Sequence, residues 1–572
     1  MSVRSRLLTL QLAFLLGVCL FLFFFGLGAF GLIGADEPRY AQIAREMFQR
    51  HDWIVPTFNG SPWLEKPVLL YWKIINSYAI LGVQDWAARL PSAFHATALV
   101  VVIFLFIRRF RPGSEMDAAL IAGSSAAVIG FARGASTDMS LSADFSMGMM
   151  AWWAWHATGK KLWLAAFFVL LAAAALAKGP VAPALALLIV GGYAWLRRDG
   201  SILQRSFWLP GFLLFCAVAL PWYIAIQVKV PRFFRVFFLE HNLERFGTNI
   251  YQHSQPFWYY IPVFILATLP WTAFTLPALI AAVRDEVQRF RTRTTADVAA
   301  GVAGQPSPPA NLAPADDRLL LFLLLWTLVP IVLFSISRSK LPGYILPSIP
   351  AAALLTADYL QRKSAIGRLH LMLHSLICGV LIAGALLTPW LSGLVYPLPC
   401  RGWCKLHFLL QVVPDRTKPW IVIISGLIAT LVLIVVRRGG RRFLHFATMV
   451  PVVLALAFLL RPAALLLDNT LSARIVDLAM RQIGIGKIPL AAFHVKREVA
   501  YGLTFYRNQP VSWYEPDGPR DLPSGVPPQE HVVIAREGSD AELTARVAPR
   551  TVTRLGDLPQ QHLEFFLVSN SK

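Results

Sequence analysis

Long apolar runs occupy most of the sequence and restrict what it can fold into. About 20 apolar residues in succession suffice to cross a bilayer as a helix, and in lipid every backbone polar group must be satisfied within the protein. Thirteen such runs lie near residues 7–33, 90–107, 117–133, 139–158, 162–177, 180–196, 207–228, 257–283, 319–336, 343–361, 369–390, 419–436 and 443–460. Charged residues make up 15% of the chain, whereas about 25% is usual in soluble proteins. The sequence therefore predicts an all-α polytopic membrane domain of about 13 transmembrane helices over residues 1–461.

Basic clusters between the runs predict the orientation. They fall on one side of the threaded chain: Arg4/Arg6, Arg108/Arg109/Arg111, Lys160/Lys161, Arg197/Arg198/Arg205, Arg284/Arg289/Arg291/Arg293, Arg362/Lys363/Arg368 and Arg437/Arg438/Arg441/Arg442. The positive-inside bias makes that side cytoplasmic, together with the N-terminus. These clusters account for the net charge of +21, so nucleic-acid binding is not expected.

Residues 462–572 lack long apolar runs and are predicted to form a small soluble α/β domain on the outer side. A helical pattern spans 471–483, and four β-like stretches cover Ile488–Val495, Thr504–Tyr514, His531–Arg536 and Leu563–Ser569.

Carboxylates gather in outer loop 34–89 and at the start of nearby apolar runs. Asp36 precedes Pro38 and, taken alone, reads as a helix N-cap. That interpretation leaves Glu37 and Glu65 in the same loop unexplained. Asp138 has the same N-cap interpretation, and Asp144 lies about two turns deeper, where a carboxylate needs a partner or water. The carboxylates therefore indicate a functional site.

Cations on the outer side run against the usual charge bias. Lys66, Lys178, Arg338 and Lys340 could each reach the headgroups individually, but together they suit a phosphate group at membrane depth. A phosphate-linked leaving group needs positive charge on its departing oxygen, while acids orient or deprotonate the acceptor. The combination indicates sugar transfer from a lipid phosphate.

Several motifs carry a resemblance to a known family. They are Asp36-Glu37, Trp63–Trp72, Asp138-Met139, Ala177–Pro180, Glu240–Phe246 with His253, Pro256–Tyr260, and Ser337–Tyr344 through Pro350. In this order they resemble the bacterial transferases that move 4-amino-4-deoxy-L-arabinose from undecaprenyl phosphate to lipid A. These are GT-C glycosyltransferases related to protein O-mannosyltransferases. Val68 stands where their Glu-Lys-Pro-Pro segment has its second proline.

The resemblance implies direct, inverting transfer to a lipid A phosphate at the periplasmic face of the bacterial inner membrane, and with it polymyxin resistance. The N-terminus would be cytoplasmic and the C-terminal domain periplasmic, in a monomer whose partners are the lipid-linked donor, lipid A and membrane lipids. Loops 34–89 and 229–256 would form the site.

The expected roles group the candidate residues. The catalytic group is Asp36, Asp138, Glu37 and Arg39, with Asp36 as the essential carboxylate. The donor phosphate would be held by Lys66, Arg245, Arg338, Lys340 and Lys178. The cavity group is Tyr40, Glu65, Tyr344, His241 and Asp144. No cofactor is expected to be required, although Glu65 and His241 are candidate ligands for a divalent metal.

Two alternatives stay open. The acceptor could be a protein hydroxyl or another glycan, since nothing in the chain reads the sugar directly. A lipid-linked sugar transporter would also carry intramembrane charges. However, the charges here gather at one face and no two-fold repeat is visible, which favours an enzyme.

Overall fold

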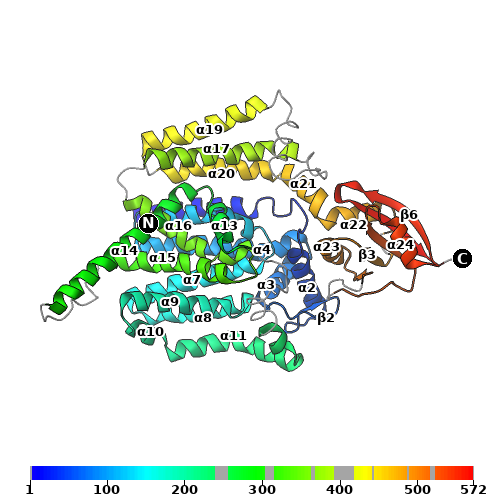
Figure 1. The fold of residues 1–572 in the computed structure, drawn as a ribbon, viewed down its shortest axis with the longest axis horizontal. Helices are drawn as coiled ribbons and strands as arrows, with labels where there is room; N and C mark the ends of the chain where they lie inside the picture. The colour runs from blue at the N-terminus through cyan, green and yellow to red at the C-terminus, as the bar shows by residue number, and fades with distance from the viewer. Residues whose placement is uncertain are drawn as a thin grey trace.

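A computed structural model describes residues 3–238, 255–302, 315–362, 367–391, 418–440, 443–460, 462–485, 488–515 and 522–570. Figure 1 shows the long helices side by side along one direction, with a strand-containing domain at one end. The predicted fold class, a helical membrane domain with a small α/β domain, is confirmed.

Most helices of the first half follow the predicted runs, and the exceptions span residues 36–50, 69–81 and 201–206. The helices of this half are α1 (Val3–Cys19), η1 (Leu20–Phe24), α2 (Asp36–Arg50), α3 (Leu69–Leu81), α4 (Asp85–Phe110), α5 (Glu115–Ser124), α6 (Ala126–Ala132), α7 (Thr137–Thr158), α8 (Lys161–Lys178), α9 (Val181–Arg197), α10 (Ser201–Ser206) and α11 (Leu209–Lys229). The single run expected at 117–133 is instead two helices, because α5 and α6 meet at 61°. The hydroxyls of Ser124 and Ser125 donate to carbonyls four residues earlier in α5, a contact that often bends helices.

The remaining helices of the membrane domain also follow the runs, except that the single run expected at 257–283 is interrupted by turns at residues 268–271. These helices are η3 (Phe257–Tyr259), α13 (Tyr260–Ala267), α14 (Thr272–Val302), α15 (Ala315–Ile336), η5 (Pro342–Ile345), α16 (Ser348–Arg362), α17 (Arg368–Leu391), α19 (Lys418–Gly439) and α20 (Leu444–Leu459). Within the described ranges, six helices are long and apolar enough to cross a membrane, or up to eight if each of two bent pairs counts as one span. The count of 13 therefore stays a prediction.

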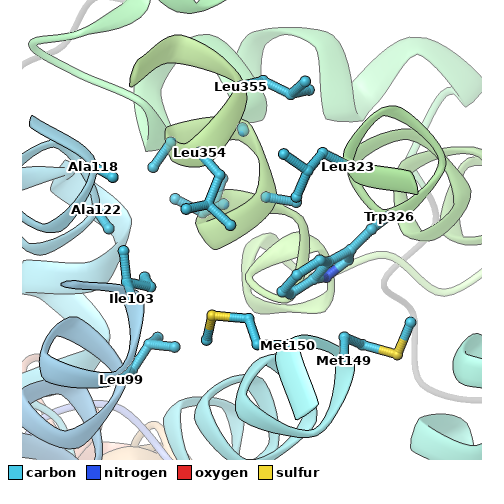
Figure 2. Packing of buried hydrophobic residues seen from close by; sticks show 14 of the residues in the cluster. Leu99, Ile103, Ala118, Ala122, Met149, Met150, Leu323, Trp326, Leu354 and Leu355 are labelled. Atoms are coloured by element: carbon cyan, nitrogen blue, oxygen red, sulfur yellow. The ribbon is translucent and has the colours of Figure 1, made fainter. Parts of the chain in front are cut away.

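The main core lies between α4, α5, α7, α15 and α16 (Figure 2). Its packed side chains include Leu99, Ile103, Ala118, Ala122, Met149, Met150, Leu323, Trp326, Leu354 and Leu355, all at most 2% exposed. The Trp326 indole N–H donates to the carbonyl of Pro347, at 2.9 Å, so its one polar group is satisfied. This core fixes α7, whose first turn carries Asp138.

The predicted outer loop 34–89 is largely structured. It contains α2, a two-stranded hairpin and α3, and it lies at the end of the helical bundle next to the C-terminal domain (Figure 1). The hairpin pairs β1 (Thr57–Phe58) with β2 (Ser61–Pro62). Of the second predicted site loop, 229–256, residues 239–254 lie outside the described ranges.

The C-terminal domain is a five-stranded mixed sheet with helices. Its elements are α21 (Pro462–Leu471), α22 (Ala473–Gln482), β3 (Leu490–Phe493), α23 (Arg497–Arg507), β4 (Val511–Trp513), β5 (His531–Arg536), α24 (Asp540–Val547), β6 (Thr551–Leu558), η8 (Pro559–Gln561) and β7 (Leu563–Ser569). The strand order is β4-β3-β5-β7-β6, with β3 parallel to β4 and β5.

One predicted strand was wrong in part. The stretch Thr504–Tyr514 was expected to be extended, but α23 continues to Arg507 and only β4 is a strand. The apolar residues of α23 are buried against α2 and α22, so tertiary packing decided between two readings of a short apolar run. The domain boundary at 461/462 stays a prediction.

Candidate functional site

Asp36 is the first residue of α2 and has the most exposed carboxylate of the site. Its side chain is 59% exposed, whereas that of its partner Arg39 is 8% exposed. The two are 2.5 Å apart, and Arg39 also lies 3.7 Å from the carboxylate of Glu65. Burial lowers the pKa of Arg39, but the nearby carboxylates of Glu65 and Asp36 raise it. Together these carboxylates outweigh burial, so the net shift of the pKa is upward. Arg39 is therefore a permanent buried cation beside an accessible acid.

Aromatic rings enclose the Arg39 guanidinium. It lies 4.5 Å from the ring centre of Trp63 and 5.5 Å from those of Tyr40 and Tyr501. Cation–π contacts of this kind favour a fixed guanidinium orientation. Burial raises the pKa of Tyr40 well above its usual value, so Tyr40 is a neutral wall of the site, as expected from the sequence.

Glu65 and Lys66 complete what we call the outer cluster: Asp36, Arg39, Glu65 and Lys66. Lys66 Nζ lies 2.7 Å from Glu65, and both side chains are about nine-tenths buried. Lys66 is also within electrostatic reach of Asp138. The outer cluster therefore extends toward the second predicted acidic position.

Asp138, in the first turn of α7, is held by a lysine and a serine. Lys178, the last residue of α8, donates to its carboxylate. The Ser136 hydroxyl donates to the same carboxylate at 3.0 Å and accepts the Asp138 N–H at 3.1 Å. Lys178 Nζ also lies 4.9 Å from the ring centre of Tyr344. The structure thus brings together three predicted site residues, Asp138, Lys178 and Tyr344.

Glu37 has different surroundings from its neighbour Asp36. Its two oxygens accept from Arg89 at 3.0 and 2.8 Å and from the backbone N–H groups of Ile33 and Ala135 at 3.0 and 2.7 Å. The contact with Ala135 joins the start of α2 to the segment that carries Asp138. This geometry supports a framework role, and the catalytic role predicted for Glu37 has no support from it.

Comparisons with known proteins agree with this arrangement. A family model of dolichyl-phosphate-mannose-protein mannosyltransferases matches residues 9–237. Similar proteins include an undecaprenyl phosphate-alpha-4-amino-4-deoxy-L-arabinose arabinosyl transferase from Pseudomonas fluorescens, 31% identical over 64% of this chain and 59% of the relative. A transferase of the same name from Serratia proteamaculans is 28% identical over 82% of this chain and 83% of the relative.

The chain is similar in sequence to aminoarabinose transferases. The resemblance drawn from the sequence motifs is thereby confirmed. The first of these alignments spans just under three fifths of the Pseudomonas protein. A solved structure of ArnT from Cupriavidus metallidurans bound to undecaprenyl phosphate covers 97% of each chain with a TM-score of 0.74, at 21% identity. The two proteins share a fold over nearly their whole length.

Arg338 and Lys340 lie at a cavity of about 540 Å³. Arg338 is exposed, and the wall beside it includes the apolar side chains of Phe257, Val332 and Ile336. Lys340 instead is buried and donates to the carbonyls of Ser337 and Gln255 at 2.5 and 3.0 Å. Arg338 is thus accessible to a ligand, whereas Lys340 ties backbone segments together.

Asp144 belongs to a separate group, which we call the inner cluster: Lys73, His95 and Asp144. Lys73 Nζ lies 3.5 Å from Asp144 Oδ2 and 2.5 Å from His95 Nε2. His95 Nδ1 is 2.7 Å from the carbonyl of Pro91, so Nδ1 carries the proton and Nε2 accepts from Lys73. No contact in the described residues links Asp144 with the outer cluster, and its predicted place in the substrate cavity lacks support.

Two residues of the predicted site, His241 and Arg245, lie outside the described residues. Within the described ranges, no group of three or more His, Cys, Asp or Glu could hold a metal ion. Because His241 is one of the two candidate ligands, the metal expectation stays untested.

Sequence reasoning missed Arg89 and Tyr501. Arg89 is fully buried and pairs with Glu37. An arginine inside the apolar pattern of α4 was a signal, since such a charge requires a partner. Tyr501 lies in the C-terminal domain, more than 460 residues from Arg39, and no local pattern connects the two.

Proposed function

We propose that the chain is a glycosyltransferase that moves 4-amino-4-deoxy-L-arabinose from undecaprenyl phosphate to a lipid A phosphate. The observation that carries the proposal is the outer cluster, where the accessible carboxylate of Asp36 stands beside the buried cations Arg39 and Lys66. The names of the arabinosyl transferase relatives support this donor and sugar. The acceptor rests on the resemblance of the motifs.

The reaction requires one bond to form and one to break at the sugar. An oxygen of the acceptor phosphate attacks the anomeric carbon, the bond from that carbon to the donor phosphate breaks, and the configuration inverts. The electron pair leaves with the donor phosphate. Lys66 is suited to stabilise that departing oxygen because it is a cation in a site with little water.

Asp36 has a positioning task in this scheme. A lipid A phosphate is already an anion at neutral pH, so it hardly needs a general base. We assign Asp36 to orient the sugar and the acceptor and to balance the site cations. The charge of Asp138 is balanced by Lys178. This ion pair holds the lysine in a fixed position in the site.

The cavity at Arg338 supports a lipid phosphate as donor. A polyprenyl phosphate combines an anionic head with an apolar chain, and here the exposed guanidinium adjoins the exposed apolar residues Phe257 and Ile336. A cation can bind the phosphate while the apolar wall takes the chain. This arrangement suits a lipid-linked donor better than a soluble sugar nucleotide.

The surroundings of the enzyme follow from the same proposal. It would lie in the bacterial inner membrane as a monomer, with a cytoplasmic N-terminus and a periplasmic C-terminal domain, and would confer polymyxin resistance. It would require no cofactor, and a divalent metal bound by Glu65 and His241 would be an addition rather than a requirement.

A protein hydroxyl as acceptor is the second candidate, because a protein mannosyltransferase family model matches residues 9–237. Purified protein in lipid nanodiscs would be incubated with radiolabelled undecaprenyl-phosphate aminoarabinose, lipid A and an acceptor protein extract. We expect label in lipid A with wild type and none with Asp36→Asn. Label in protein alone would overturn the lipid A acceptor, and no label anywhere would overturn the transferase proposal for this donor.

A further inference from the structure

The backbone between η1 and α2 has no regular structure, although it leads directly to Asp36. Residues 27–33 connect the first membrane helix to the catalytic helix, and Leu27 and Leu32 in it are buried. Backbone N–H and C=O groups in such a segment need partners from elsewhere, because unpaired buried polar groups are costly. The partners identify what fixes the position of Asp36.

Arg89 of α4 supplies the partners on the membrane side. Its guanidinium donates to the carbonyls of Leu27, Phe30 and Gly31 at 2.9, 2.8 and 2.8 Å. The same guanidinium binds Glu37 in the first turn of α2. One spanning helix therefore holds both the segment and the helix that follows it.

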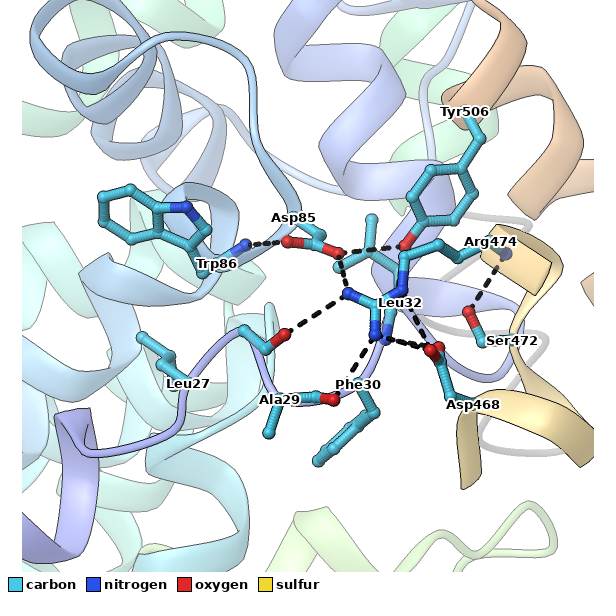
Figure 3. A network of polar contacts seen from close by, with 12 residues as sticks. Leu27, Ala29, Phe30, Leu32, Asp85, Trp86, Asp468, Ser472, Arg474 and Tyr506 are labelled. Carbon is cyan, nitrogen blue, oxygen red and sulfur yellow. Dashed lines mark hydrogen bonds and ion pairs between the residues drawn. The ribbon is translucent and has the colours of Figure 1, made fainter. Parts of the chain in front are cut away.

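The C-terminal domain supplies the partners on the other side (Figure 3). Arg474 of α22 donates to the carbonyls of Gly28 and Ala29, each at 3.3 Å. The N–H of Gly31 donates to Asp468 at 2.8 Å, and that of Leu32 donates to the Tyr506 hydroxyl at 2.7 Å.

Asp85, the first residue of α4, closes this network. Its carboxylate lies 3.2 Å from Arg474 and accepts from the Tyr506 hydroxyl at 3.3 Å. Arg474 is also 2.5 Å from Asp468. Two carboxylates thus fix one guanidinium, which in turn holds two backbone carbonyls. Such charge-assisted bonds are about twice as strong as neutral ones.

Gly31 shows how closely the domain approaches. A Cβ built at this position would lie 2.2 Å from the Ser472 hydroxyl oxygen and 2.5 Å from the Tyr506 hydroxyl oxygen. These atoms belong to the C-terminal domain, so a side chain at residue 31 would require side chains of that domain, or the segment itself, to shift.

We propose that the C-terminal domain positions the catalytic carboxylate, with Arg474 as the positioning residue that acts through segment 27–33 on Asp36. The inference rests on the proposed transfer reaction for its kinetic consequence. Arg474 touches no substrate. Its loss removes two of the four hydrogen bonds by which the C-terminal domain holds the segment, those to the carbonyls of Gly28 and Ala29. The segment can then shift together with Asp36, and a displacement of about 1 Å at a reacting centre can cost up to about a hundredfold in rate.

The test compares Arg474→Ala with Arg554→Ala, a control in the same domain. Arg554 forms ion pairs with Asp557 and Glu564 on the sheet and has no contact with segment 27–33. Hydrogen exchange would be measured by mass spectrometry on peptides covering 26–40 and β5, and transfer kinetics on the same preparations. We expect Arg474→Ala to speed exchange in 27–33, leave β5 protected and lower kcat about tenfold or more at unchanged donor KM.

A second, milder variant covers the case in which Arg474→Ala unfolds the whole C-terminal domain. Tyr506→Phe removes only the hydroxyl that contacts Leu32 and Asp85, and we expect faster exchange at Leu32 with a smaller fall in kcat. Unchanged exchange in 27–33 in both variants, or a KM effect with unchanged kcat, would overturn the inference. If wild type transfers no aminoarabinose, the proposed function fails, while the exchange experiment still decides whether the domain holds the segment.

Discussion

The outer and inner clusters are both largely buried groups of acids and bases, but they differ in the solvent exposure of their aspartate. In the inner cluster Asp144, Lys73 and His95 face one another, and the Asp144 side chain is 7% exposed. In the outer cluster Arg39 is equally buried, but its partner Asp36 is 59% exposed. The inner cluster satisfies its own charges, whereas the outer one leaves a carboxylate to meet a substrate.

The difference teaches how to separate structural from functional charges in a membrane enzyme. Burial alone does not distinguish them, because both clusters contain groups that are about nine-tenths buried. The informative property is whether one member of the network remains accessible. By that criterion we expect Asp36 to act in the reaction and Glu37, which accepts from four N–H donors, to have a structural role.

The largest expected effect is on Asp36. Asp36→Asn removes the accessible charge with little change in volume. Because the carboxylate orients the sugar and the acceptor, we expect kcat to fall about a thousandfold with an unchanged melting temperature. The control is Asp557→Asn, since Asp557 is also a half-exposed acid paired with an arginine three positions away. Normal transfer by Asp36→Asn would remove the distinction between the two clusters.

For the inner cluster we expect a loss of stability instead. Asp144→Asn leaves Lys73 as a buried charge without its carboxylate, at a cost of about 3 kcal/mol in unfolding free energy. The double variant with Lys73→Met should recover part of that loss, because the unpaired charge is gone. Thermal unfolding in detergent measures both. A stable Asp144→Asn that has lost transfer would move Asp144 into the active site.

A smaller effect is expected at Lys178, whose ammonium balances Asp138. Lys178→Met should lower kcat/KM about thirtyfold, equivalent to about 2 kcal/mol for a lost charge-assisted hydrogen bond. Lys229→Met is the matched control, since Lys229 is also the last residue of its helix and lies 3.5 Å from an aspartate, Asp52. Equal losses in the two variants would point to a shared effect at helix ends.

The smallest effect is expected at Arg338, which lies at the cavity. Arg338→Gln should raise KM for the lipid-linked donor up to about fivefold and leave kcat unchanged, because exposed ion pairs contribute about 1 kcal/mol at most. Titration of the donor at saturating acceptor measures this, with Arg497→Gln as an exposed control. A fall in kcat without a change in KM would place Arg338 at the reacting atoms instead.

The sequence predicted the helical frame well and the chemical neighbourhoods only in part. Hydropathy is a property of consecutive residues, so each predicted apolar run contains helix. Neighbouring acids were harder to separate: Asp36 and Glu37 look alike in the chain, and their difference arises from Arg89, which lies 52 positions away from Glu37. Asp144 was grouped with the outer acids for the same reason. Its partners Lys73 and His95 come from α3 and α4, which lie far from α7 in the sequence.

The contact between Glu37 and Ala135 has a mechanical consequence. It fastens the start of α2 to the segment before α7, and breaking it would disturb the carboxylate that balances the fully buried Arg89. The start of α2, which carries Asp36, and the segment that leads to Asp138 are therefore joined directly. The η5 turn adds a third part to this joint, because the ring of Tyr344 contacts Lys178 and the backbone of Gly343 packs so closely on the Asp138 carboxylate that a Cβ there would lie 2.8 Å from it.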